Sequence, residues 1–102
     1  MPSGKWEGYF QEEGGKRFVS YELFFSERGK VSGRGKDCDV VGSFSWDAVA
    51  YRPRVEWKES HDWGTLTFAA LLEVRQELSG SFSVSDGGGG HGTLSFVPPP
   101  EP

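Results

Sequence analysis

Apolar and polar residues alternate strictly through most of this sequence, and this period of two constrains the fold more than any other feature. In the segment Val40–Trp46, the valine, glycine, phenylalanine and tryptophan at even positions share one face. A valine and two serines occupy the other face. Successive side chains of a β-strand point to opposite sides, so this pattern predicts a half-buried antiparallel strand.

The same alternation recurs in eight segments that are separated by short turn signals. Residues 69–78 also have helical propensity, but the alternation resumes directly afterwards and favours a strand followed by a turn. Short connections between consecutive segments predict an antiparallel meander. The predicted strands span residues 5–12, 17–26, 30–36, 40–46, 54–59, 63–73, 77–85 and 92–97.

Glycines on the predicted inner face indicate that the sheet is strongly coiled. Glycine permits sharp bends and a close approach of backbone, here across the barrel interior. Eight strands are a natural number for closure, which removes both sheet edges. We therefore predict an all-β, eight-stranded, antiparallel up-and-down β-barrel over residues 1–97, followed by a proline-rich tail at 98–102. A β-sandwich is the alternative, because a period of two does not distinguish closure from two packed sheets. The inward glycines are Gly8, Gly33, Gly35, Gly42, Gly80 and Gly92.

Composition limits the classes of function. The formal net charge of −4 disfavours nonspecific nucleic-acid binding, which needs a basic surface. No apolar run approaches the roughly 20 residues of a membrane helix. The single cysteine, Cys38, excludes an internal disulfide, and the N-terminal residues lack the apolar run of a signal peptide. We therefore expect a cytoplasmic protein with no membrane and no nucleic-acid partner.

Short motifs resemble those of the calycin group of small β-barrels. Gly4-Lys5-Trp6 resembles the Gly-x-Trp start of lipocalins, fatty-acid-binding proteins and avidins. The spacing of residues 31–33, 42–44, 55–58 and 78–82 is most similar to the third, fourth, fifth and seventh strands of avidins. This resemblance implies a closed ligand-binding barrel. It does not imply biotin binding, because the first predicted strand has no polar inward residue and residues 93–97 contain no aspartate.

Aromatic side chains predominate on the predicted inner face. Barrels of this size are either filled by their own side chains or hold one small ligand, and the sequence leaves both possibilities open. For the second, we predict a noncatalytic binding module with a small apolar or aromatic ligand at one barrel mouth. Tyr21 would supply a polar contact. The candidate ligand-binding residues are Trp6, Tyr21, Phe44, Trp46, Trp57 and Phe82.

Aromatic residues on the predicted outer face suggest an alternative function. Tyr9, Phe18, Phe24 and Trp63 would point outward. If they cluster, they would form a contact surface for a second copy of the chain or for a protein partner. This reading predicts a protein-interaction or oligomerisation domain with a filled core.

Polar clusters are predicted to lie in turns. Aspartates favour turns, and Asp37-Cys38-Asp39 lacks the ligand spacing of a calcium loop. The hairpin residues Glu59, His61 and Asp62 are expected to be solvated, and the run at 87–90 is expected to be a flexible loop. With no convergent polar set inside the barrel, we predict no catalytic residues, no metal site and no cofactor.

Overall fold

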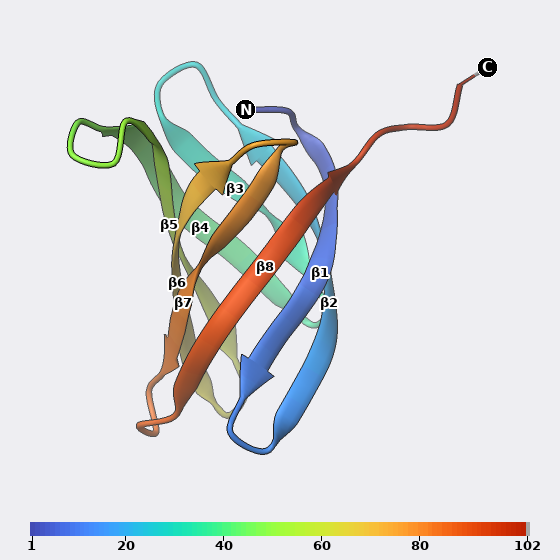
Figure 1. Ribbon diagram of the computed structural model, residues 1–102. Helices are drawn as coiled ribbons and strands as arrows, with labels where there is room; N and C mark the ends of the chain where they lie inside the picture. The colour runs from blue at the N-terminus through green and yellow to red at the C-terminus, as the bar shows by residue number, and fades with distance from the viewer. Residues whose placement is uncertain (102) are drawn as a thin grey trace.

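The computed structural model describes residues 1–101, which form eight β-strands and no helix (Figure 1). The strands are β1 (Gly4–Glu12), β2 (Gly15–Phe25), β3 (Lys30–Gly35), β4 (Cys38–Asp47), β5 (Arg52–His61), β6 (Gly64–Glu73), β7 (Glu77–Val84) and β8 (Gly89–Val97).

The sheet closes into a barrel with meander order. Each strand pairs antiparallel with the next one along the chain, and β1 also pairs with β8. The closing register runs from Lys5 opposite Val97 to Gln11 opposite His91. Every strand therefore has two hydrogen-bonded neighbours. This confirms the predicted all-β barrel and excludes the alternative of a β-sandwich.

Several strands are longer than the sequence predicts. Cys38 and Asp39 belong to β4 and pair with β3, so the predicted turn at 37–39 is wrong for these two residues. Gly89 and Gly90 belong to β8 and pair with β7, so only the first half of the glycine run is a turn. In both places, pairing with a neighbouring strand outweighs the local preference for a turn. The stretch 69–78 forms strand, turn and strand, as predicted.

Four of the six inward glycines lie where paired strands approach each other closely, and the other two, Gly35 and Gly92, lie against aromatic side chains. A Cβ atom at Gly42 would collide with the carbonyl oxygen of Glu56 and the backbone of Trp57, its partner on β5. Gly8 and Gly80 face carbonyl oxygens of their own neighbouring strands in the same way. The close approach is thus between adjacent strands, and not across the interior as the sequence suggested. It allows the sharp coiling of a small barrel.

The middle of the barrel is filled by large side chains. Trp6, Phe10, Trp57 and Phe68 are each at most 1% exposed. The ring of Phe10 stacks on that of Phe82 with a centroid distance of 4.8 Å. The interior therefore resembles an ordinary packed core at this level.

The two ends of the barrel differ. At the end that carries both termini (top of Figure 1), the indole Nε1 of Trp6 donates a 3.0 Å hydrogen bond to the carbonyl of Pro2. The backbone NH of Phe25 donates to Ser3 Oγ, and Met1 packs against the core. The N-terminal residues thus cover this end, and a cavity is found at the opposite end.

Residues 98–101 continue beyond β8 without joining the sheet, and Pro102 of the predicted tail lies outside the described residues. Across residues 1–101, no helix is long and apolar enough to cross a membrane.

Candidate ligand-binding site

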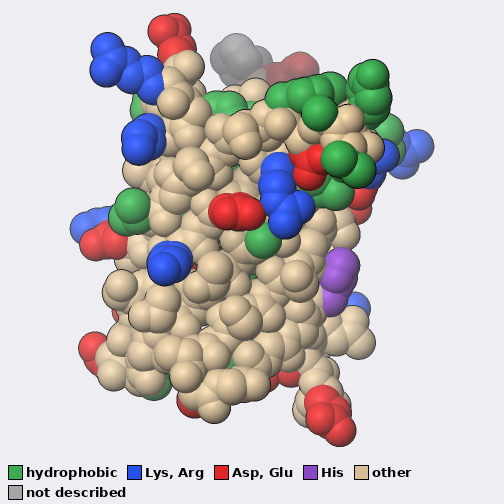
Figure 2. Space-filling view, turned by 90° about the vertical axis from the view of Figure 1, so that its left-hand side faces the viewer, with side chains coloured by type: hydrophobic (Ala, Val, Ile, Leu, Met, Phe, Trp, Pro, Cys, Tyr) green, Lys and Arg blue, Asp and Glu red, His purple; other side chains and the backbone are tan. Residues whose placement is uncertain are grey.

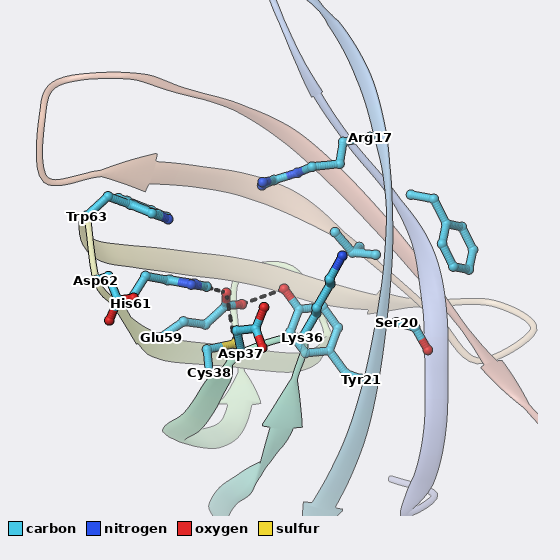
Figure 3. A pocket seen from close by; sticks show the side chains of 12 residues that line it. Arg17, Ser20, Tyr21, Lys36, Asp37, Cys38, Glu59, His61, Asp62 and Trp63 are labelled. Carbon is cyan, nitrogen blue, oxygen red and sulfur yellow. Dashed lines mark hydrogen bonds and ion pairs between the residues drawn. The ribbon is translucent and has the colours of Figure 1, made fainter.

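A cavity of about 440 Å³ opens at the end of the barrel opposite the termini. It lies between the start of β2, the β3–β4 turn and the β5–β6 hairpin (Figure 3). We call it the mouth cavity. Its lining consists of residues 17–21, 36–38, 59 and 61–63.

Glu59 forms the buried polar floor of the mouth cavity. It is 2% exposed and is the one buried charged residue among residues 1–101. It points inward because β5 continues to His61, so residue 59 follows Val55 and Trp57 on the inner face. The prediction of a solvated Glu59 is therefore wrong.

Four side chains converge on the carboxyl group of Glu59 (Figure 3). The hydroxyl of Tyr21 donates a 2.5 Å hydrogen bond to Oε2, and the indole Nε1 of Trp57 donates a 2.9 Å bond to the same atom. His61 Nε2 lies 2.9 Å from Oε1, and the Cys38 thiol donates to Oε1 over 3.6 Å. Within residues 1–101, no buried side-chain nitrogen or oxygen lacks a hydrogen-bond partner.

Burial and the nearby carboxylate keep two of these donors protonated. Burial, and secondarily the charge of Glu59, raises the pKa of the Cys38 thiol to about 11. The same two causes raise the pKa of the Tyr21 hydroxyl well above its ordinary value. Both groups therefore keep their protons at neutral pH and donate hydrogen bonds to Glu59.

The rim of the mouth cavity carries charges of both signs and one aromatic wall. The side chains of Arg17 and Lys36 reach toward the space over Glu59, while Asp37 lies on the β3–β4 turn and Asp62 on the β5–β6 hairpin (Figure 3). Neither cation forms an ion pair with another residue in the 1–101 range. The ring of Trp63 stacks on His61 with a centroid distance of 4.7 Å and an interplanar angle of 12°.

Three of the lining residues also have the chemistry of metal ligands. One atom from each of Cys38, Glu59 and His61 lies within 4.8 Å of the others. The thiol comes from the first residue of β4, and the other two ligands come from the end of β5. Sulfur, carboxylate oxygen and imidazole nitrogen are the ligand types that zinc prefers.

Of the candidate ligand-binding residues on the inner face, Tyr21 lines the mouth cavity. Trp6, Trp57 and Phe82 are buried in the core, where their rings pack against other side chains. The indole of Trp57 still contributes to the site, because its NH reaches Glu59 beneath the cavity.

The two candidates on β4 lie nearer the other end of the barrel. Phe44 is partly buried and packs edge-on against Phe25. Trp46 is 60% exposed and contacts the ring of Tyr51, so the prediction that it lies in the interior is wrong. Trp46 follows Val40 and Phe44 at alternate positions of β4 and so lies on the inner face, but at the end of the strand the barrel wall no longer encloses it.

The outer aromatic residues do not form one continuous surface. Tyr9 and Phe18 pair edge-to-face across β1 and β2 with a centroid distance of 5.8 Å. Phe24 is six residues from Phe18 on β2, about 20 Å along the strand. Trp63 lies in the β5–β6 turn and lines the mouth cavity, as Phe18 does, so Phe24 is the residue of the four that is set apart. On the face shown in Figure 2, hydrophobic side chains gather along the top and upper right, and charges of both signs are scattered beside and below them.

Four residues of the mouth cavity were not recognised from the sequence as members of one site: Arg17, Cys38, Glu59 and His61. Cys38 and His61 continue the inward alternation of their strands two positions beyond the predicted ends. Arg17 and Glu59 are the inward residues at the terminal positions of the predicted strands 17–26 and 54–59. Following the alternation to the barrel rim would have placed all four on the inner face.

Comparison with known proteins gives no family match, no match among curated proteins and no match among solved structures. The closed eight-stranded barrel is consistent with the calycin-like architecture expected from the motifs. A closer relationship to avidins stays a prediction.

Proposed function

We propose that this protein is a noncatalytic binding barrel that holds a small aromatic or apolar molecule with an anionic group in the mouth cavity. The observation that carries this proposal is a buried carboxylate, with its donors already in place, beneath an open cavity. Burying a charge is costly, and such preorganised polar groups are typical of binding sites. The volume of about 440 Å³ suits a small ligand.

Arg17 and Lys36 are the groups at the rim that would hold an anionic ligand, and Asp37 and Asp62 line the same cavity. Glu59 is occupied by four hydrogen-bond partners, which disperse its negative charge. Arg17 and Lys36 are exposed and have no ion-pair partner within residues 1–101. A sulfonate, carboxylate or phosphate would pair with them, while the ring of Trp63 would contact the apolar part of the ligand.

Binding of the fluorescent aromatic anion 8-anilinonaphthalene-1-sulfonate tests this proposal. We expect saturable binding of one probe per chain, with enhanced probe fluorescence. The double variant Arg17→Gln/Lys36→Gln should bind about 2–30-fold more weakly, because exposed ion pairs contribute roughly 0.2–1 kcal/mol each.

A matched control lies at the opposite end of the barrel. Arg28→Gln/Lys30→Gln removes the same charge from the β2–β3 turn and the start of β3, far from the mouth cavity. It should leave probe affinity unchanged. Equal weakening by both double variants would show that only net charge matters, and unsaturable binding would show that no defined site exists. Either result would contradict the proposal.

The alternative of a protein-contact surface rests on the exposed Tyr9–Phe18 pair. Because Phe24 lies apart from this pair, the exposed aromatic surface is small, and a protein-contact function is the weaker of the two candidates. If the Tyr9–Phe18 pair mediates self-association, sedimentation will show an oligomer that Tyr9→Ser/Phe18→Ser converts to a monomer. An unchanged mass would rule out this function.

We also propose a cytoplasmic location. A free, partly buried cysteine without a disulfide partner suits a reducing compartment.

A further inference from the structure

We propose that Cys38, Glu59 and His61 form a binding site for a divalent transition metal ion of the zinc type. The sequence alone predicted no metal site. This inference shares the mouth cavity with the proposed function but does not require a bound small molecule. It rests on the placement of three ligand atoms and on the way the Glu59 carboxylate is held.

The two oxygens of Glu59 have different partners. Oε2 accepts hydrogen bonds from Tyr21 and Trp57, both of which belong to the core side of the site. Oε1 faces the other way and is contacted by the Cys38 sulfur and His61 Nε2. One oxygen is thus anchored, and the other is shared by the two groups that would join it in binding a metal.

This division matches the two shells of a metal site. Groups that ligate a metal are commonly oriented by hydrogen bonds from an outer shell. Tyr21 and Trp57 would be that outer shell, since neither contacts the proposed ligand atom Oε1. Alternate residues of β5 supply three of these groups: the outer-shell donor is Trp57, the carboxylate is Glu59 and the imidazole is His61.

The two distances to Glu59 Oε1 need little adjustment, whereas the Cys38 sulfur and the His61 nitrogen, within 4.8 Å of each other, would have to approach to about 3.5 Å. With Zn–S near 2.3 Å and Zn–O near 2.0 Å, tetrahedral geometry separates sulfur from oxygen by about 3.5 Å. The Cys38 sulfur is 3.6 Å from Glu59 Oε1. With Zn–N near 2.0 Å, nitrogen and oxygen would lie about 3.3 Å apart. His61 Nε2 is 2.9 Å from the same oxygen, so it would move by a few tenths of an ångström.

The charges also balance. On binding, the Cys38 thiol releases its proton to solvent, and the sulfur binds as a thiolate. The thiolate and the Glu59 carboxylate together neutralise the two positive charges of the ion, while His61 binds as neutral imidazole.

Three protein ligands leave one tetrahedral position open. Because these residues line the mouth cavity, that position would face the cavity and be filled by water or by a donor atom of a ligand. A metal ion here would offer this open coordination position to the anionic group of a ligand, in the same cavity as Arg17 and Lys36.

Titration of the chelator-treated protein with Co²⁺, followed by absorption spectroscopy, tests the inference. One Co²⁺ per chain should produce a thiolate-to-metal charge-transfer band and the intense visible bands of tetrahedral cobalt. Zn²⁺ should abolish both by displacement. Cys38→Ser should lose the charge-transfer band, and His61→Gln should lose more than the roughly 10–100-fold in affinity typical of outer-shell variants.

The chain offers a matched control because it contains one other histidine. His91 lies on β8 and contacts Ser79 Oγ, away from the mouth cavity. His91→Gln should bind Co²⁺ like the unmodified protein, and circular dichroism of each metal-free variant checks that it is folded. Absence of a charge-transfer band in the folded unmodified protein would overturn the inference. The inference would also be overturned if His61→Gln and the unmodified protein bound Co²⁺ with equal affinity.

Tyr21→Phe gives a readout of the outer shell. It should weaken Co²⁺ binding about 10–100-fold while the charge-transfer band persists at saturation. Failure of metal binding is distinct from failure of the proposed function, because the fluorescent anion is titrated into the metal-free protein. Probe binding without metal binding would contradict only the metal site.

Discussion

The hydroxyl of Tyr21 donates a 2.5 Å hydrogen bond to Oε2 of Glu59, linking β2 to β5 across the inside of the barrel. The two residues are 38 positions apart in the sequence, and both are almost fully buried. Their contact makes a buried charge tolerable and fixes the orientation of its second oxygen toward the mouth cavity. The stability of the barrel and the geometry of the site therefore depend on the same bond.

Removing the Tyr21 hydroxyl should destabilise the protein. In Tyr21→Phe, Glu59 loses one of its two donors at Oε2 while the aromatic ring is retained. Hydrogen bonds to charged groups contribute roughly 1.5–3 kcal/mol, so we expect a loss of that size in the free energy of unfolding measured with urea.

Tyr9→Phe is the control for this substitution. Tyr9 is 48% exposed on the outer face, and its loss of a hydroxyl should change stability by less than about 0.5 kcal/mol. If the two variants lose equal stability, the hydroxyl of Tyr21 does not stabilise buried Glu59.

A single methyl group at Gly42 should be destabilising. The Cβ atom of Gly42→Ala would collide with the backbone of β5, and overpacking typically costs about 1–3 kcal/mol. Gly14→Ala is the control, because no atom lies within 4 Å of a Cβ there. Thermal unfolding should show a lower midpoint for the first variant and little change for the second. If both variants unfolded at similar midpoint temperatures, the close approach of β4 and β5 would not be the reason for a glycine at position 42.

Cys38 should react slowly with thiol reagents in the metal-free protein. Because the pKa of its thiol is raised to about 11, the reactive thiolate is scarcer at pH 8 than in an ordinary cysteine. The rate of modification by a disulfide reagent should rise with pH up to about 11. Glu59→Gln removes a charge that raises this pKa, so it should speed the reaction at pH 8. A rate profile centred near 8.5, that of a free cysteine, would contradict the buried environment.

The alternation of side chains predicts the fold because it records which face of each strand is buried. Eight such segments with short turns leave few arrangements, and inward residues such as Trp6 and Phe10 are buried as expected. Closure itself is a pairing between β1 and β8, residues far apart in the sequence. No local pattern in either strand specifies it, although the inward glycines favour it.

The site was harder to predict because its polar residues lie where the strands end. Glu59 and His61 are on the inner face of β5, yet a charged residue at the end of a strand usually belongs to a solvated turn. Burial of Glu59 becomes favourable only when Tyr21 and Trp57 are brought to it. That depends on the register between strands, which the sequence pattern leaves open.

The most direct test of the proposed binding site is to locate the ligand on the protein. Two-dimensional ¹H–¹⁵N NMR spectra of the metal-free protein would be recorded during titration with 8-anilinonaphthalene-1-sulfonate. We predict that the largest shifts fall on the backbone amides of residues 17–21, 36–38 and 59–63 and on the indole NH of Trp63. Amides of the β2–β3 turn and of the β4–β5 loop, at the other end, should not move. Largest shifts at that other end, or on the outer face of β1 around Tyr9, would contradict the assignment of the mouth cavity as the binding site.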